Sequence, residues 1–326
     1  MGMTAVPQPR PVVIDTDPGL DDALALLLAL RAPEWQVELI TTVAGNVPVA
    51  QATANVHQVL AMLALPTAPV VAVGSRQPLR RPLHTATMVH GDDGLGGITT
   101  LRTPEGVLVY PPPRLPAVSP HAVPRLLRLV RQHGRALTVI ALGPLTNIAR
   151  AIQADPETMQ QLGRLVIMGG AIAVPGNVSP VAEFNIYVDP HAADVVFQAG
   201  LPITLVPLDV TQHVRLTPDL LPSTRQAART PVAQALVDLT RYAFQRYPEG
   251  MTLHDPLAVA VALDPSLVTC ASLPIGVETR GVRTRGMTVA DRRPARADSE
   301  TLPRLEVAMA VQTARVLELC MTRWLA

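Results

Sequence analysis

Short apolar segments alternate with longer amphipathic segments over most of the chain. This alternation favours βαβ units and a largely parallel sheet, because strands buried on both faces read as continuous apolar runs. We predict strands at 11–15, 37–43, 70–73, 138–142, 165–168 and 203–206. We predict helices at 21–31, 49–64, 255–263 and 311–325, and a strand-like segment at 286–290. The expected fold is an α/β, Rossmann-like, largely parallel or mixed sheet flanked by helices, with the ligand site at the carboxyl edge of its strands.

The sequence predicts a single domain, because neither repeats nor linkers interrupt the alternating pattern. We find no internal repeat and no clear linker in the sequence. One long irregular segment, 75–120, is dense in Gly, Pro and Arg, and loops of that length inside a domain tend to be functional. The C-terminal third is less regular than the rest. We therefore expect a single domain over 1–326, with residues 1–10 forming a disordered N-terminal tail.

The charged residues exclude several classes of protein. The 27 basic residues balance 26 acidic ones to a net charge of +1, so no polybasic footprint for nucleic acid is present. All of the basic residues are arginine. Without lysine, the chain has no P-loop lysine, no kinase strand lysine and no Schiff-base nucleophile.

The cysteines and apolar runs describe the expected compartment. Cys270 and Cys320 are too few for a disulfide framework. The N-terminal residues lack the charged and apolar regions of a signal peptide, and apolar runs such as 23–30 are far shorter than the ~20 residues that span a bilayer. We expect a cytoplasmic protein with neither membrane nor nucleic acid as its partner.

The strongest local signal is an acidic turn directly after the first predicted strand. Four carboxylates lie within eight residues: Asp15, Asp17, Asp21 and Asp22. The Pro18-Gly19 turn is expected to bring them toward one point, and like charges this close repel unless a cation lies between them. A hard divalent cation with oxygen ligands fits this arrangement. The alternative is that the last two cap the helix while the first two are solvated. An EF-hand is excluded, because position twelve of either possible loop is a leucine.

Other polar clusters lie at the same predicted edge of the sheet. His254 and Asp255 begin an apolar helix and can be a proton donor and a metal ligand, or a surface histidine and a helix cap. Glu183 and Asn185 suit a polyhydroxylated ligand, or they are ordinary loop polarity. Asn46 follows the second strand, where Gly45 allows the backbone to approach a ligand.

Several fragments occur together and in order: DTDPGLDD, TTVAGN, HGDDG, GPLTNIA, MGGA, VAEFN, LHDPLAVA and GMTVAD. This set resembles the inosine-uridine preferring nucleoside hydrolase family from about residue 12 to residue 291. The resemblance implies hydrolysis of the N-glycosidic bond of ribonucleosides to ribose and free base, with a tightly bound calcium ion. It also implies a homodimer or homotetramer that acts in nucleoside salvage and in purine or pyrimidine metabolism.

The resemblance also implies a role for individual residues. Calcium ligands would be Asp17, Asp22, Asp255 and the main-chain carbonyl of Leu142. Asp17 would also activate water, and His254 would lie beside the leaving base. The residues that would contact the substrate are Asp21, Asn46, His90, Met168, Asn177, Glu183 and Asn185.

The sequence thus predicts a calcium-dependent ribonucleoside hydrolase of the uridine and inosine type, whose partner is a small ribonucleoside. Two alternatives come from other classes: a non-catalytic nucleoside or ribose binder, and a haloacid-dehalogenase-like phosphatase. The phosphatase is disfavoured because its usual lysine is missing. The aromatic residues that can contact the base are Tyr242, Phe244 and Tyr247, and the sequence does not choose among them.

Overall fold

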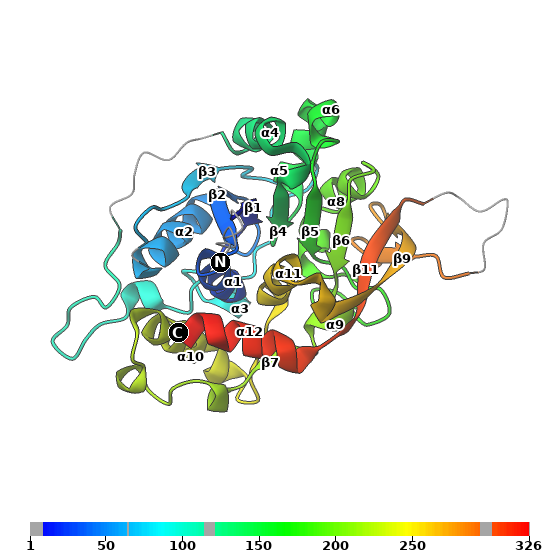
Figure 1. The fold of residues 1–326 in the computed structure, drawn as a ribbon. Coiled ribbons are helices and arrows are strands. Elements are labelled where there is room, and N and C mark those ends of the chain that lie inside the picture. The colour runs from blue at the N-terminus through cyan, green and yellow to red at the C-terminus, as the bar shows by residue number, and fades with distance from the viewer. Residues whose placement is uncertain (1–8, 64, 114–120, 294–301, 326) are drawn as a thin grey trace, which may run out of the picture.

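A central sheet dominates the computed structural model, which describes residues 9–63, 65–113, 121–293 and 302–325. Within these residues the sheet has nine strands in the order β10-β9-β11-β6-β5-β4-β1-β2-β3. Figure 1 shows the labelled strands from β9 to β3 side by side. Neighbouring strands from β11 to β3 are parallel, whereas β9 and β10 run antiparallel to their neighbours. The strands are β1 (Arg10–Thr16), β2 (Trp35–Thr42), β3 (Val70–Val73), β4 (Thr138–Ala141), β5 (Arg164–Met168), β6 (Ile203–Val206), β9 (Val268–Val277), β10 (Thr288–Ala290) and β11 (Arg304–Val311). A separate small sheet pairs β7 (Arg215–Leu216) with β8 (Met251–Thr252).

Helices connect and cover the strands. The longer ones are α1 (Leu20–Leu30), α2 (Val49–Leu63), α4 (Ala122–His133), α5 (Thr146–Ala154), α8 (Pro190–Phe197), α10 (Pro231–Arg246), α11 (His254–Leu263) and α12 (Thr313–Leu325). The short ones are α3 (Thr87–His90), α6 (Pro156–Met159), α7 (Phe184–Val188) and α9 (Leu208–Thr211). Single 3-10 turns lie at η1 (Ile98–Thr100), η2 (Gly134–Ala136), η3 (Pro218–Leu220), η4 (Arg225–Ala227) and η5 (Pro265–Leu267).

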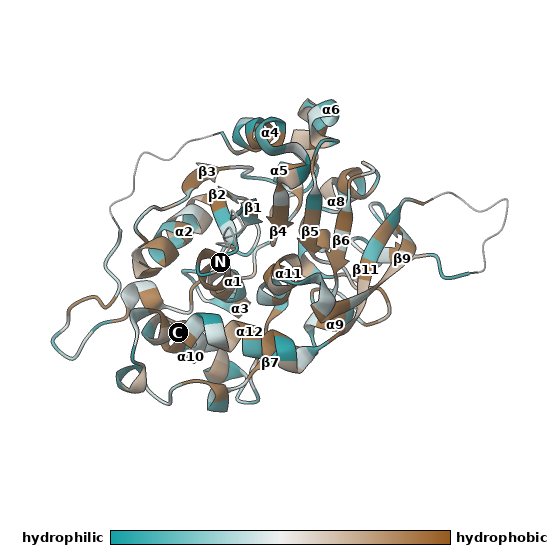
Figure 2. Cartoon of the chain, viewed as in Figure 1, coloured by the Kyte–Doolittle hydropathy of each residue, from teal (hydrophilic) through white to brown (hydrophobic). Residues whose placement is uncertain are grey.

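The sheet separates two hydrophobic cores because side chains alternate between its faces. Val12 and Ile14 of β1 pack into one core with α1, α2, α10, α11 and α12, whereas Val13 packs into the other with α4, α5 and α8. Helix α1 lies deep in the first core and is apolar nearly all round, as a helix surrounded by other elements must be. Figure 2 shows α1 and β4 as predominantly hydrophobic.

The strand order reverses beside β1, and this reversal positions the site. From β1 the chain proceeds outward through β2 and β3, then returns to place β4 on the other side of β1. In open α/β sheets the loops that follow two such strands leave the sheet in opposite directions at its carboxyl edge. Ligands of open α/β sheets bind at such a point.

The predicted α/β fold with a mixed, mostly parallel sheet is confirmed. The predictions at 70–73 and 203–206 match β3 and β6 in full. In the C-terminal third the predicted helix 255–263 and strand 286–290 correspond to α11 and β10, whereas β9 and β11, which complete the sheet, were not predicted. The last helix begins at Thr313 rather than at 311, because Val311 ends β11.

The expected N-terminal tail is corrected at one end. Arg10 already belongs to β1 and pairs with Trp35, whereas residues 1–8 lie outside the described part of the chain. Residue 64, expected to end the second helix, also lies outside it. Across the residues that are described, no helix combines the length and apolar character needed to cross a membrane.

Candidate functional site

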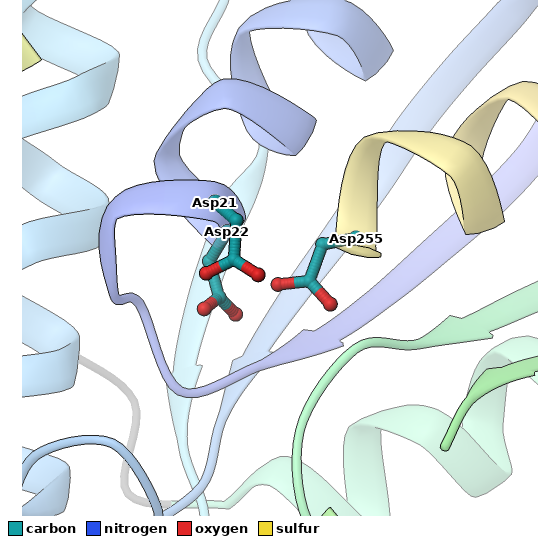
Figure 3. Close-up of side chains that lie close together, drawn as sticks. All are labelled: Asp21, Asp22 and Asp255. Carbon is teal, nitrogen blue, oxygen red and sulfur yellow. The ribbon is translucent and has the colours of Figure 1, made fainter. Parts of the chain in front are cut away.

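Two helices present carboxylates to each other at the carboxyl edge of the sheet. Asp21 and Asp22 lie in the first turn of α1, and Asp255 lies in the first turn of α11 (Figure 3). One carboxylate oxygen from each of the three lies within 4.8 Å of the others. The positive ends of both helix dipoles point toward this cluster and favour negative charge there. The cluster thus joins residues from the two ends of the sequence.

Burial makes the cluster electrostatically costly without a cation. Asp21, Asp22 and Asp255 are 9 %, 0 % and 3 % exposed. Burial, together with the charge of Asp22, raises the pKa of Asp21 to about 6 and that of Asp255 well above its usual value. Buried carboxylates that share a site keep their charge only when a cation balances them. Their hard oxygen donors fit a divalent cation such as Ca²⁺ or Mg²⁺ better than a softer metal.

Asp17 lies beside this cluster in a frame of backbone and glycine. Its Oδ2 accepts the Asn46 backbone N–H at 2.6 Å, while its buried Oδ1 has no hydrogen-bond partner among the described residues. Burial, reinforced by the charges of Asp22 and Asp21, raises its pKa. A Cβ at Gly45 or Gly143 would lie 2.0 or 2.3 Å from an Asp17 carboxylate oxygen. The two glycines thus make room for this side chain rather than only for a ligand.

Asp22 organises the acidic turn as well as facing the cluster. Its Oδ1 accepts from the Thr16 hydroxyl at 2.5 Å, and its Oδ2 accepts from the Gly19 backbone N–H at 2.9 Å. The Asn46 side-chain amide donates to the same Oδ2 at 3.0 Å. The helix-capping alternative is therefore correct for Asp22, but capping does not take it away from the cluster.

Asp15 does not join the other carboxylates, and this part of the sequence analysis was wrong. Its Oδ1 accepts from the Thr41 hydroxyl at 2.5 Å and from the Asn147 side-chain amide at 2.7 Å. Side chains alternate along β1, so Asp15 faces the α5 side of the sheet while Thr16 faces α1. Burial raises the pKa of Asp15 to about 7, against the opposing effect of these two hydrogen bonds.

Asn147 is a polar residue that the sequence analysis did not single out. Its side-chain amide nitrogen donates to the Thr42 carbonyl as well as to Asp15, and its Oδ1 accepts the Ser75 backbone N–H at 2.8 Å. One amide thereby joins the carboxyl ends of β1 and β2 to the residues after β3. The fragment GPLTN, a loop followed by a buried helix, contained the available signal.

Asn185 connects the ends of two other strands. Its side-chain amide donates to the Leu142 carbonyl at 2.6 Å and to the Met168 carbonyl at 3.2 Å. These carbonyls follow or end β4 and β5, so Asn185, Leu142 and Met168 meet at the same edge of the sheet as the acidic cluster. All three residues are buried.

Glu183 and Asn177 lie at the entrance to α7. Both oxygens of the buried Glu183 accept backbone N–H groups, from Gly170, Asn185 and Ile186. Its carboxylate therefore caps α7. Asn177 is exposed, and its Oδ1 accepts the Phe184 backbone N–H at 2.9 Å. The sequence offered ordinary loop polarity as the alternative role for Glu183. In the structure its carboxylate caps the first turn of α7.

His90 is neutral and fixed in one tautomer. Its Nδ1 lies 3.9 Å from Asp21 Oδ1, but the same atom accepts the Leu20 backbone N–H at 3.1 Å and so carries no proton. Burial lowers the pKa of His90 to about 4. The remaining nitrogen, Nε2, is therefore a donor. A Cβ at Gly19 would lie 2.5 Å from this ring, which is why the turn before α1 needs glycine.

His254 lies at the start of α11, next to Asp255. Its Nδ1 is 2.8 Å from the Thr211 hydroxyl oxygen. Burial lowers its pKa; the charge of Asp21 opposes that shift and His90 adds to it. The two histidines and Asp21 are thus close enough to influence one another, on the α1 and α11 side of the sheet. Thr211 was not identified from the sequence, because no local pattern relates residues 211 and 254.

Among the three aromatic candidates, Tyr242 lies near the first residue of α1. A Cβ at Gly96 would lie 2.7 Å from Tyr242 Cβ and 3.2 Å from Leu20 Cδ2, which places Tyr242 beside the start of α1. Arg246 lies over the Tyr242 ring and donates to its hydroxyl. Tyr247 is exposed and Phe244 packs against the first core.

The sequence matches a known family over nearly its whole length. Residues 12–318 match the family described as inosine-uridine preferring nucleoside hydrolase. The pyrimidine-specific ribonucleoside hydrolase RihA of Salmonella paratyphi B is 39% identical over 287 residues, which cover 86% of this chain and 88% of that protein.

Solved structures agree with this match. A plant nucleoside hydrolase, the PpNRh1 enzyme, superposes with a TM-score of 0.85 at 35% identity, over 98% of this chain and 99% of that chain. A purine-preferring ribonucleoside hydrolase from Gardnerella vaginalis also has a TM-score of 0.85, at 33% identity, over 96% of this chain and 98% of that chain. The similar proteins therefore differ in the base they prefer.

Proposed function

The chain belongs to the inosine-uridine preferring nucleoside hydrolase family and is a ribonucleoside hydrolase, and from this premise we propose that its reaction depends on calcium and on Asp17. The observation that carries the proposal is the approach of three buried carboxylates, from residues 21, 22 and 255, to within 4.8 Å. Because the chain is a ribonucleoside hydrolase, the two alternative functions, a non-catalytic binder and a phosphatase, no longer apply.

The residues present fit a calcium ion. Asp17, Asp22, Asp255 and the Leu142 carbonyl would hold it. The buried, unpartnered Oδ1 of Asp17 and the raised pKa values of Asp17 and Asp255 support this, because each describes a carboxylate that lacks a positive neighbour. When bound, the ion supplies a Lewis acid that acidifies water and orients the hydroxyls of the ribose.

Asp17 is the general base in this proposal. Its Oδ2 is occupied by the Asn46 backbone N–H, so Oδ1 is the atom that accepts the proton of the attacking water. The water oxygen then forms the bond to C1′ while the bond from C1′ to the base nitrogen breaks. Because the sugar passes through an oxocarbenium-like state, nearby carboxylates stabilise the developing positive charge. Asp21 would bind a ribose hydroxyl.

His254, in its imidazolium form, would supply a proton from Nε2 to the leaving base and become neutral, while its Nδ1–H donates to the Thr211 hydroxyl. His90 would donate a hydrogen bond from Nε2, because the Leu20 N–H keeps its Nδ1 unprotonated. Asn46, Met168, Asn177, Glu183 and Asn185 would surround the sugar. Uridine and inosine are the expected substrates.

The test is an assay of base release from uridine, cytidine, inosine and adenosine, with calcium, with a chelator, and after calcium is restored. We expect release from uridine and inosine, loss of release with the chelator, and recovery with calcium. Release that persists after exhaustive metal removal contradicts the calcium proposal but leaves the family assignment intact.

A further inference from the structure

Thr211 makes a hydrogen bond that its own helix does not require. It ends α9, is fully buried, and places its hydroxyl oxygen 2.8 Å from His254 Nδ1, 43 residues further along the chain. Threonine in a helix commonly turns its hydroxyl back to the carbonyl four residues earlier. In α9 that carbonyl, from Pro207, accepts the ordinary backbone N–H of Thr211 at 3.1 Å, whereas the hydroxyl contacts His254.

The element that carries Thr211 is held firmly. Asp209, two residues earlier in α9, accepts the backbone N–H groups of Ile172 and Ala173 at 2.8 and 2.7 Å. Helix α9 follows β6 directly and is thereby tied to the loop after β5. A threonine side chain in a helix is largely restricted to two χ1 rotamers, and the contact with the His254 ring selects one of them. The hydroxyl of Thr211 is therefore a fixed point against which a ring can be oriented.

The contact decides which nitrogen of His254 remains for the substrate. With Nδ1 engaged, Nε2 is the nitrogen left on the side of the site. A hydroxyl can donate to an unprotonated Nδ1 or accept from a protonated one, so it suits either tautomer of the ring. His90 differs in this respect, because the Leu20 N–H that holds it can only donate.

We propose that Thr211 is the positioning residue for His254: its hydroxyl holds Nδ1 and thereby directs Nε2 toward the leaving base. The proposal rests on the function proposed above for His254. It assigns Thr211 no contact with the substrate, so its effect should be confined to substrates whose leaving group needs a proton.

The first experiment compares two substrates in Thr211→Val and Thr211→Ser. Valine keeps the shape of threonine without the hydroxyl, and serine keeps the hydroxyl. For uridine we expect Thr211→Val to lower kcat ~10-fold or more with little change in KM, a part of the ~10²–10⁴-fold that general acid catalysis supplies. For p-nitrophenyl riboside, whose leaving group departs as a stable anion, kcat should stay within about 2-fold. Thr211→Ser should retain most of the activity toward uridine.

Controls separate positioning from stability. Thr240 is also buried, and its hydroxyl bonds to the Leu236 carbonyl of its own helix, so Thr240→Val removes a buried hydroxyl that is bonded within its own helix. It should leave kcat for both substrates unchanged. Thr211→Ala provides the same comparison if valine does not pack, and thermal unfolding shows whether each variant is folded.

A double-mutant cycle distinguishes the two proposals. In a His254→Ala background, Thr211→Val should lower kcat for uridine no further, because it acts only through the ring. Equal losses on both substrates, or an undiminished loss in the His254→Ala background, would overturn the role of Thr211 alone. Normal hydrolysis of uridine by His254→Ala would instead overturn the role proposed for His254.

Discussion

Asp17 occupies a space that two glycines leave open. Gly45 and Gly143 come from the ends of the second and fourth strands, and neither has a positive φ, so conformational freedom is not the reason for glycine there. The reason is contact, because any β-carbon would collide with the carboxylate. The position of Asp17 thus depends on the absence of a β-carbon at Gly45 and Gly143, as well as on the hydrogen bond from the Asn46 N–H.

Gly143→Ala should therefore displace Asp17. The added Cβ would lie 2.3 Å from Oδ1, and the carboxylate cannot turn away easily because it is buried and held through Oδ2. We expect kcat for uridine to fall by ~10²-fold, the effect of a misplacement of about 1 Å in a catalytic group. Gly276→Ala is the control, because its nearest neighbour, at 3.1 Å, is the flexible end of Leu302. Similar kinetics in the two variants would contradict the role of the glycine frame.

Asp17→Asn tests the carboxylate itself. The amide has nearly the same shape and can still accept the Asn46 N–H, so the fold should persist. It is a much weaker base, so turnover of uridine and inosine should fall ~10²-fold or more. Thermal unfolding of the metal-free protein should be unchanged or shifted upward, because the variant removes one of several repelling buried charges. Near-normal base release would refute the role of Asp17.

At the level of single residues, the sequence identified the candidate carboxylates but not the side of the sheet that each of them faces. The carboxylates of Asp21, Asp22 and Asp255 lie within 4.8 Å of one another, and the charge of Asp17 acts on the pKa of Asp255. Asp15 does not join them, because the alternation of strand side chains persists through Thr16 and breaks only at the turn beyond it. The partnership of Thr211 and His254 depends on how α9 and α11 pack, and no local pattern contains that information.

Among the elements, β9 and β11 were the hardest strands to predict. β4 and β5 are buried on both faces and read as apolar runs, whereas most positions of β9 are half-buried or exposed, and β9 contains Pro274. Proline lacks the N–H that a sheet ladder uses, which argues against a strand when only the sequence is known. The structure accommodates Pro274 in an antiparallel strand near the edge of the sheet.

A buried charge cluster joins the long irregular segment to α10. Tyr110, in the segment 75–120, donates its hydroxyl to Asp238 of α10 at 2.7 Å, and Arg225 of η4 contacts both. Asp238 is 5 % exposed. The same helix carries Tyr242 one turn later, beside the start of α1. The cluster therefore holds α10 and part of the segment in place next to the site.

Asp238→Asn should weaken this connection without changing its shape. We expect the free energy of unfolding to fall by about 1.5–3 kcal/mol, as for lost hydrogen bonds to charged groups, measured by urea denaturation. Hydrogen exchange of residues 101–110 should quicken. Glu249→Gln, which removes an exposed ion pair with Arg215, should cost no more than about 1 kcal/mol. Equal effects of the two variants would show that the cluster contributes no more than a surface pair.

In the molecule as a whole, the C-terminal helix α12 contacts the N-terminal helix α1 and the residues that follow it. The Trp324 indole of α12 donates to the Leu24 carbonyl of α1 at 3.2 Å, and Arg323 pairs with Glu34. β11 lies in the same sheet as β1, although nearly the whole sequence separates them. Contacts of this kind couple the stability of distant segments.

We therefore propose that residues 1–326 form one domain that unfolds in a single cooperative transition. Differential scanning calorimetry in the presence of calcium should give one peak, with calorimetric and van't Hoff enthalpies in agreement. Trp324→Phe keeps an aromatic ring but removes the indole N–H and part of the buried volume, and should shift that one peak downward rather than split it. Two separable transitions would contradict the single domain.

Metal removal should lower the stability of the entire molecule as well as its activity. Asp17 and Asp22 follow the first strand, whereas Asp255 lies in the first turn of α11, in the last third of the chain. An ion bound by all three therefore joins α1 to α11, which both pack into the first hydrophobic core. A ligand that binds only the folded state stabilises it by about 2.7 kcal/mol at a concentration of 100 Kd. Calcium should therefore raise Tm, and a chelator should lower both Tm and kcat.

In Asp255→Asn the rise of Tm with calcium should shrink, because one carboxylate ligand is gone. Magnesium, which demands stricter octahedral geometry, should substitute poorly. If neither Tm nor kcat responds to complete removal of metal, the buried carboxylates must be balanced by protons instead, and the calcium proposal fails.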